Sequence, residues 1–158
     1  MEHIVNEIHL LLIKHKKTVA VAESCTGGLT SKLLTDIPGS SRYFILGIVA
    51  YSNQAKRTIL KIPYHIITKY GAASKPVAMA MAKSIRKNAK ADFGIGITGI
   101  AGPKGATPQK PIGTVFIVID SKNKKICKRF IFKGNRNTVR KQAALNALEL
   151  LKSILIKV

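Results

Sequence analysis

The apolar positions of the chain change their spacing several times, which predicts alternating helices and strands. Between Ile4 and Lys16, apolar side chains recur every three or four residues, the period of an amphipathic helix. The stretch 18–22 is short, apolar and β-branched, which is typical of a buried strand. Helical spacing returns at Leu29 and lasts until the Pro-Gly pair at 38–39. The first forty residues therefore predict a helix, a strand and a second helix.

Beyond residue 40, apolar runs again alternate with helical periods. The first expected elements are a strand at 43–51, a short helix that carries Lys56 and ends at Pro63, and a loop through Tyr70 and Gly71. A helix from Ser74 as N-cap to about Lys90, a strand at 92–98 and a Gly/Pro-rich loop at 99–111 should follow. The last expected elements are strands at 112–119 and 125–132, joined by a tight turn, and a helix from about Arg136. This order predicts a single three-layer α/β domain over residues 1–158. Its sheet is mixed and mostly parallel, because the closing hairpin requires at least one antiparallel strand.

The composition is that of a folded domain with a strongly basic surface. Of the 158 residues, 46% are hydrophobic and 22% charged, so the chain can form a core and is too apolar for a disordered tail. The formal net charge is +20. Nucleic-acid binders concentrate such charge on one face, often with aromatics, whereas here basic residues are scattered and aromatics are only 6%. We therefore favour a solvated surface over a nucleic-acid footprint, and expect no specific nucleic-acid partner.

The sequence also argues against several other classes of protein. The longest apolar runs, such as 44–51, are far too short to cross a bilayer, and the N-terminus lacks a secretory pattern, so we expect a cytoplasmic protein without a membrane partner. Cys25 and Cys127 form no CxxC pair, and the four histidines are scattered. This pattern supports neither a disulfide framework nor a metal site, and we expect no cofactor.

The first candidate site is the turn that follows the first strand. Ser24 stands there, followed by Thr26, Gly27 and Gly28 and then by a helix. A hydroxyl at this place would lie beside unpaired main-chain N–H groups and the positive end of a helix dipole, where an anion or an oxyanion can bind. A simple helix cap is the alternative interpretation. Cys25 is a second candidate nucleophile, although buried packing is the commoner role of a free cysteine.

A hydroxyl nucleophile needs a base, and no histidine is suitably placed, which leaves a carboxylate or a neutral lysine. Lys56 follows the second strand, so it reaches the same sheet edge as Ser24 if the first two strands are parallel neighbours. A lysine acts as a base only when burial or nearby positive charge lowers its pKa. An exposed surface lysine is the alternative. Tyr51 can hydrogen-bond to either group, or it may simply end a strand.

The segment 94–99 formally matches GxGxxG, the dinucleotide-binding motif. We reject that interpretation, because the motif lies within a strand and prolines follow where a helix should begin. Thr98 and Gly99 are better interpreted as the end of the third strand. They would meet Ser24 and Lys56 in one crevice, unless the Gly-rich loop only connects two elements.

Several segments together resemble a known family. They are Ala22–Gly28, Pro38–Ser41, Ala50–Asn53 with Lys56, Gly71–Ala72, Ile97–Pro103 and Pro111–Val115. In this order, and over nearly the whole chain, they resemble the CinA C-terminal domain family, which includes stand-alone nicotinamide-nucleotide amidases. The resemblance implies a fold like that of anticodon-binding domains, with a mixed five-stranded sheet that has one antiparallel strand.

The resemblance also implies an activity and a set of site residues. The activity is hydrolysis of the carboxamide of nicotinamide mononucleotide to nicotinate mononucleotide and ammonia, with a small-molecule nucleotide as the partner. Ser24 matches the nucleophile and Lys56 the general base, with Tyr51 beside them. The other candidate positions would bind the substrate or the oxyanion, and they are Thr26, Gly27, Gly28, Asn53, Thr98, Gly99 and Arg136. Among them, Arg136 is a candidate cation for the phosphate. A catalytically silent domain that binds a nucleotide or a partner, linked to competence or DNA damage, is the alternative.

Three positions depart from the family pattern. Asn135 stands where an aspartate is common, Gln109 stands where an acidic residue precedes Lys-Pro, and Lys104 adds a positive charge to the Gly/Pro loop. We expect these changes to make the crevice more positive. By the same resemblance we expect a homodimer, and any activity of the N-terminal domain found in larger members cannot be carried over.

Overall fold

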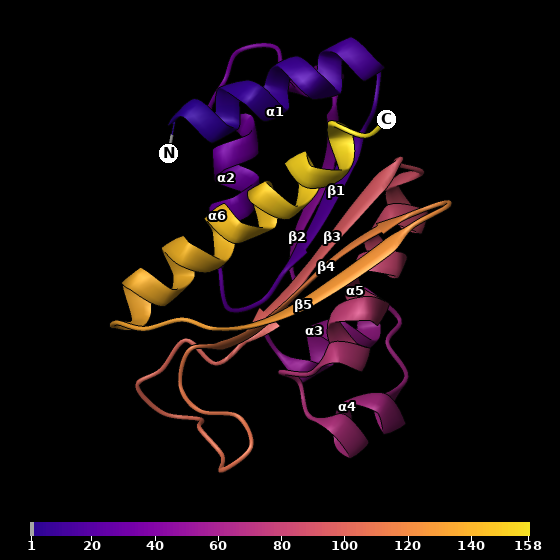
Figure 1. Cartoon of the computed structure of the whole chain (residues 1–158). Coiled ribbons are helices and arrows are strands. Elements are labelled where there is room, and N and C mark those ends of the chain that lie inside the picture. The colour runs from indigo at the N-terminus through magenta and orange to yellow at the C-terminus, as the bar shows by residue number, and fades with distance from the viewer. Residues whose placement is uncertain (1) are drawn as a thin grey trace.

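The computed structural model describes the fold of residues 2–158 (Figure 1). Its elements in order are α1 (Glu2–His15), β1 (Val19–Glu23), α2 (Leu29–Thr35), a short 3-10 helix (Ser40–Arg42), β2 (Phe44–Val49), α3 (Asn53–Thr58), α4 (Tyr64–Tyr70), α5 (Lys75–Ala89), β3 (Phe93–Gly99), β4 (Thr114–Ser121), β5 (Lys125–Ile131) and α6 (Arg136–Leu155). Among the helices described, none is both long and apolar enough to cross a bilayer.

The five strands form one sheet in the order β2-β1-β3-β4-β5. β1 lies between β2 and β3 and is parallel to both. β4 is antiparallel to β3 and to β5, so four strands run in one direction and β4 alone runs against them. The predicted α/β fold with a mixed, mostly parallel five-stranded sheet is confirmed.

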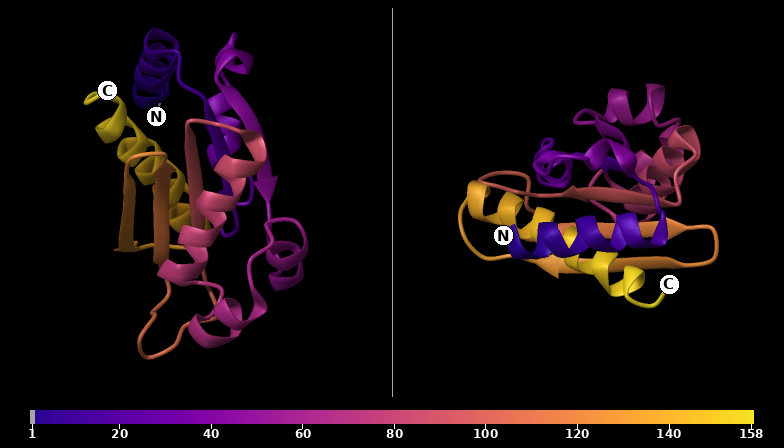
Figure 2. Two further views of the ribbon diagram at one scale, coloured as in Figure 1. Left: turned by 90° about the vertical axis from the view of Figure 1, so that its right-hand side faces the viewer. Right: turned by 90° about the horizontal axis from the view of Figure 1, so that it is seen from above.

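Helices cover both faces of the sheet, which gives three layers (Figure 2). On one face, α2 and α6 pack against the strands and α1 packs against α6 and α2, around a core that includes Ile8, Ile95 and Leu148. On the other face, α5 lies along β1, β3 and β4, and α4 packs against α5. The apolar periods of the predicted helices are thus explained by burial on one side of the sheet or the other.

One predicted loop is wrong. Residues 64–70 form α4, whereas the sequence predicts a loop from Pro63 through Gly71. Pro63 immediately precedes the first turn of α4, with φ −58°, a conformation that suits the start of a helix as well as the end of one. Ile67 is buried against the core under α5 and holds this short helix in place. The chain therefore carries three α-helices, not two, between β2 and β3.

The glycines of the 94–99 segment have a packing role. Both Gly94 and Gly96 lie within β3, and a Cβ atom at either position would overlap main-chain atoms of α5, at Ala82 and Ala78 respectively. The missing side chains let α5 approach the sheet closely. This explains the GxGxxG pattern without a dinucleotide, as the sequence analysis had concluded.

Candidate active site

Ser24 is held between two strands at the carboxyl end of β1. Its N–H donates to the carbonyl of Ile97 in β3 at 3.0 Å, and the N–H of Ala50 donates to the carbonyl of Glu23 at 2.9 Å. Ladder bonds of the sheet thus fix the main chain on both sides of the serine. The predicted meeting of strand ends at one edge is realised here, next to α3 and the loop at 100–113 (Figure 1).

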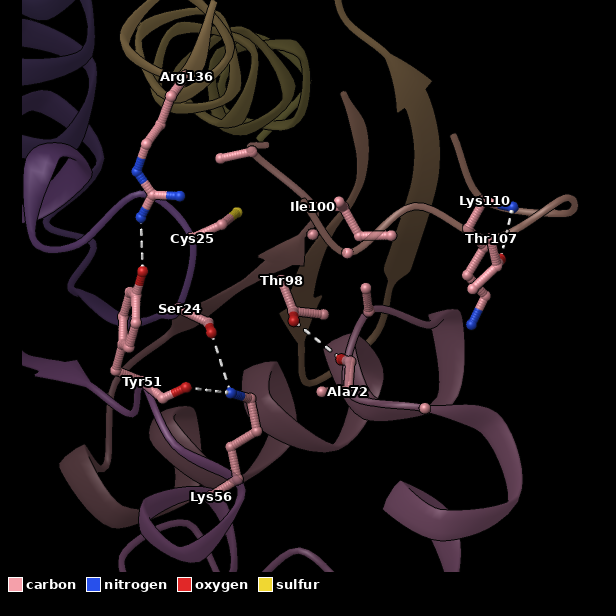
Figure 3. A pocket seen from close by; sticks show the side chains of 15 residues that line it. Ser24, Cys25, Tyr51, Lys56, Ala72, Thr98, Ile100, Thr107, Lys110 and Arg136 are labelled. Carbon is pink, nitrogen blue, oxygen red and sulfur yellow. Dashed lines mark hydrogen bonds between the residues drawn. The ribbon is translucent and has the colours of Figure 1, made fainter. Parts of the chain in front are cut away.

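Lys56 reaches this edge from α3. The Ser52 side chain caps α3 by accepting from the N–H of Ala55 at 3.0 Å, which fixes the first turn of the helix. The Lys56 side chain runs inward, and the residue is only 1% exposed. Its Nζ lies 2.9 Å from Ser24 Oγ, so the expectation that the two residues converge is confirmed, and an exposed surface lysine is excluded (Figure 3).

The surroundings of Lys56 favour its neutral form. Besides Ser24, Nζ donates to the carbonyls of Ala50 at 2.9 Å and Tyr51 at 3.1 Å, and none of the salt bridges within residues 2–158 involves it. Burial lowers the pKa of the Lys56 amine because the charged form loses its hydration. A neutral amine keeps two N–H groups, enough for the two carbonyls, and its lone pair can then accept the Ser24 hydroxyl proton.

Cys25 does not compete as a nucleophile. The residue is buried, and burial raises the pKa of its thiol to about 12. The thiolate is the reactive form, so the cysteine is inert near neutral pH. A negative charge on Cys25 would raise the pKa of the Lys56 amine, but the thiol is neutral near neutral pH.

The helix that follows Ser24 does not offer the free N-terminus that the sequence suggested. The buried carboxylate of Glu23 accepts from the N–H groups of Thr30 at 3.0 Å and Ser31 at 2.8 Å, and from the Ser31 hydroxyl at 2.7 Å. The first turn of α2 is therefore already neutralised by an anion of the protein itself. Ser24 is not the cap of this helix, since Gly28 occupies that position without a side chain.

A cavity of about 390 Å³ opens beside Ser24 and Lys56, which together form a candidate catalytic dyad (Figure 3). The predicted residues that line it are Ser24, Tyr51, Lys56, Thr98, Gly99 and Arg136. The Thr98 hydroxyl donates to the carbonyl of Ala72 at 2.8 Å and joins β3 to the segment before α5. Arg136 donates to the Tyr51 hydroxyl at 2.6 Å and to the carbonyl of Gly102 at 2.8 Å. Tyr51 therefore points along the cavity wall toward α6 and does not touch Lys56 through its hydroxyl.

Four predicted residues lie outside the lining of this cavity: Thr26, Gly27, Gly28 and Asn53. Thr26 is fully buried, and its carbonyl accepts from Arg140 at 3.0 Å. Both glycines have positive φ, 62° and 94°, which the tight turn into α2 requires. Asn53 is exposed at the start of α3. These four residues shape the turn and the helix starts around the dyad.

Part of the cavity wall was not expected from the sequence. Besides Cys25, which the sequence suggested as a second nucleophile, the additional lining residues are Gly71, Ala72, Ala73, Ile100, Ala101, Gly105, Thr107 and Lys110. Most come from the segment before α5 and from the Gly/Pro loop, whose course has no periodic signal in the sequence. Gly71–Ala72 and Ile97–Pro103 belong to the segments that resemble the family, and this resemblance was the one signal in the sequence that could have placed them at the cavity.

The three departures from the family pattern do not line the cavity. Asn135 caps α6 by accepting from the N–H of Thr138 at 3.0 Å, so it keeps the capping function of an aspartate without its charge. Gln109 and Lys104 are exposed on the loop. The expected rise in positive charge thus falls around the cavity and not on its wall.

Within residues 2–158, no group of three or more His, Cys, Asp or Glu side chains could hold a metal ion.

The fold and the site define a class: an α/β domain with a buried serine–lysine pair in a cavity at the carboxyl ends of parallel strands. The sequence matches the CinA C-terminal domain over residues 1–155, and the chain belongs to that family. A CinA-like protein of Thermotoga neapolitana is 48% identical over 142 residues, which cover 90% of this chain and 35% of the relative. The chain thus spans about a third of the length of such curated relatives.

Solved structures agree with this assignment. The competence damage-inducible protein A of Klebsiella pneumoniae has a TM-score of 0.94 at 30% identity, with 98% of this chain and 96% of that chain covered. The competence/damage inducible protein CihA of Agrobacterium tumefaciens has a TM-score of 0.93 at 34% identity, with coverages of 96% and 93%. The names of these proteins state no reaction.

Proposed function

We propose that this chain is a serine–lysine amidohydrolase, and that its substrate is the carboxamide of nicotinamide mononucleotide. The observation that carries the proposal is the 2.9 Å hydrogen bond between Ser24 and a buried Lys56 with no carboxylate partner among the described residues. Lysines buried in this way are found where a base is needed at neutral pH. The choice of substrate rests on the family resemblance, and the cavity volume suits a small ligand.

The reaction begins with proton transfer. Neutral Lys56 takes the proton of the Ser24 hydroxyl as Oγ attacks the carboxamide carbon, which forms a tetrahedral intermediate with a negative oxygen. The C–N bond then breaks, the lysine ammonium returns the proton to the leaving nitrogen, and ammonia departs. The carbonyl stays on Ser24 as an ester. Lys56 is again neutral and can activate water, which cleaves the ester to the carboxylate and restores the serine.

The oxyanion needs hydrogen-bond donors close to Ser24. The N–H of Gly27, which the sequence analysis had included, donates to the carbonyl of Ser24 at 3.1 Å and is engaged. The main-chain N–H groups of Cys25 and Thr26 donate to no other residue in the part of the chain described. We assign the oxyanion to these two groups, since preorganised main-chain donors contribute strongly to acyl transfer.

Ammonia release from nicotinamide mononucleotide tests the proposal. We expect turnover by the wild type and a fall of at least about a thousandfold in kcat for Ser24→Ala and Lys56→Ala. Cys25→Ala is the matched control for a second nucleophile at the same turn and should stay active. Full activity in either dyad variant would refute the pair. Binding of the nucleotide without turnover by the wild type would instead favour a catalytically silent binding domain.

A further inference from the structure

The cavity carries another cation at the end away from Ser24. Lys110 lines the wall formed by the Gly/Pro loop, while Arg136 and Tyr51 lie on the opposite side (Figure 3). Thr98 and Ile100 lie between Ser24 and Lys110 in this view. Lys110 directly precedes the family segment Pro111–Val115, and the proposed reaction at Ser24 does not use it.

The main chain at Lys110 is held rigidly. Its N–H donates to the carbonyl of Thr107 at 3.1 Å and lies 3.1 Å from the Thr107 hydroxyl, and the Thr107 N–H donates back to the Lys110 carbonyl at 2.9 Å. This small bridge fixes the direction in which the lysine leaves the loop. The Lys110 residue as a whole is half-buried.

The Lys110 ammonium is incompletely satisfied. Its Nζ donates to the carbonyl of Tyr70 at 2.7 Å, at the C-terminal end of α4. An ammonium has three N–H groups, and the described part of the chain supplies no carboxylate to this one. Arg136 also keeps free N–H groups, because only two of its five donate, to Tyr51 and Gly102, but these two bonds hold the guanidinium on the opposite wall of the cavity. Lys110 is held by a single hydrogen bond.

The wall beside Lys110 is open to an anion. Gly71 faces the ammonium, and a Cβ there would lie 3.4 Å from Nζ, so the glycine leaves room beside the charge. The next two residues, Ala72 and Ala73, also line the cavity, and their N–H groups donate to no other residue in the described chain. The residues that line the cavity include no Asp or Glu. A cation with free main-chain donors nearby suits an oxyanion.

We propose that Lys110 and the Gly71–Ala73 segment form a subsite for the phosphate monoester of the substrate. This rests on the proposed function, which places the carboxamide at Ser24. In a nicotinamide mononucleotide the carboxamide and the phosphate are at opposite ends of the molecule, so the phosphate lies at the end of the cavity away from Ser24. The phosphate accepts from the Lys110 ammonium more strongly than the neutral Tyr70 carbonyl does. Arg136 is bonded to Tyr51 and Gly102 on the opposite wall, so this proposal places the phosphate at Lys110 instead of at Arg136.

The test compares nicotinamide mononucleotide with nicotinamide riboside, which lacks the phosphate. Both are titrated calorimetrically into the Ser24→Ala protein, where no turnover disturbs the binding. We expect the mononucleotide to bind more tightly, and Lys110→Ala to lower this preference about tenfold while riboside affinity is unchanged. Lys110→Arg should restore most of the preference. Lys104→Ala, an exposed lysine on the same loop outside the cavity lining, is the matched control and should change nothing.

Two results would overturn the subsite. One is an unchanged preference in Lys110→Ala, and the other is an equal loss for both ligands, which would mean that Lys110 only supports the loop. The amidase proposal is tested separately by ammonia release from the wild type. A phosphate preference that depends on Lys110, together with no ammonia release, would support the subsite and refute the amidase. Ammonia release by the wild type, together with a preference for the mononucleotide that does not depend on Lys110, would support the amidase and refute the subsite.

Discussion

Nζ of Lys56 lies 2.9 Å from Oγ of Ser24, although the two residues are 32 positions apart in the chain and belong to different elements. The remaining partners of the amine are the carbonyls of Ala50 and Tyr51, which follow β2 directly. In a serine–histidine pair, a third side chain usually orients the base. Here the main chain at the end of a strand orients the amine, so the dyad needs no further side chain for this purpose.

The lowered pKa of Lys56 predicts the pH dependence of the activity. Because only the neutral amine accepts a proton, kcat/KM for the mononucleotide should rise with pH as Lys56 is deprotonated, with a midpoint below the ordinary lysine value of 10.5. A pH–rate profile measured across the neutral and alkaline range checks this. A rising limb centred at or above 10.5, or a rate that falls through this range, would contradict it.

The same shift predicts how stability depends on pH. The folded pKa of Lys56 lies below its unfolded value near 10.5, so between the two values the unfolded chain binds one more proton. The free energy of unfolding contributed by this group therefore rises with pH in that window, and is flat below it. Relative to Lys56→Met, wild type should gain stability as pH rises through the window. Denaturant titrations of both proteins at several pH values measure the difference, which a pH-independent result would disprove.

The raised pKa of Cys25 predicts resistance to alkylation. With a value of about 12, the thiolate fraction at pH 8 is on the order of one in ten thousand. Iodoacetamide at that pH should leave the proposed amidase activity intact for hours, and mass spectrometry should find Cys25 unmodified in the folded protein. The control is the unfolded chain, in which Cys25 should react readily. Rapid labelling of Cys25 in the native protein, with loss of ammonia release, would show the opposite.

Replacing Glu23 by Gln should weaken the turn that carries Ser24. The amide loses the negative charge that faces the first turn of α2 and one acceptor oxygen, at a cost of about 1–2 kcal/mol in the free energy of unfolding. Activity should fall as well, since Ser24 is the next residue. Asp36→Asn makes the same chemical change at the exposed end of α2 and should cost little. Equal effects of the two substitutions on stability would argue against the role of Glu23.

The meeting of Ser24 and Lys56 could be predicted because it depends on strand order. A short apolar strand precedes each residue, and parallel neighbours bring their carboxyl ends to one edge. Two kinds of information were missing. The pairing of Glu23 with the N–H groups of Thr30 and Ser31 depends on the shape of a two-glycine turn. The placement of Lys110 depends on an irregular loop and on α4, a helix that the sequence analysis interpreted as a loop.

The two ladder bonds around Ser24 bear on how the protein would lose its proposed site on heating. Because the N–H of Ser24 pairs with Ile97 and the carbonyl of Glu23 pairs with Ala50, the main chain at Ser24 cannot shift unless β1 separates from its neighbours. β1 lies in the interior of the sheet, where opening requires nearly the whole domain to unfold. Displacement of Ser24 and the cooperative melting of the sheet should therefore coincide on heating.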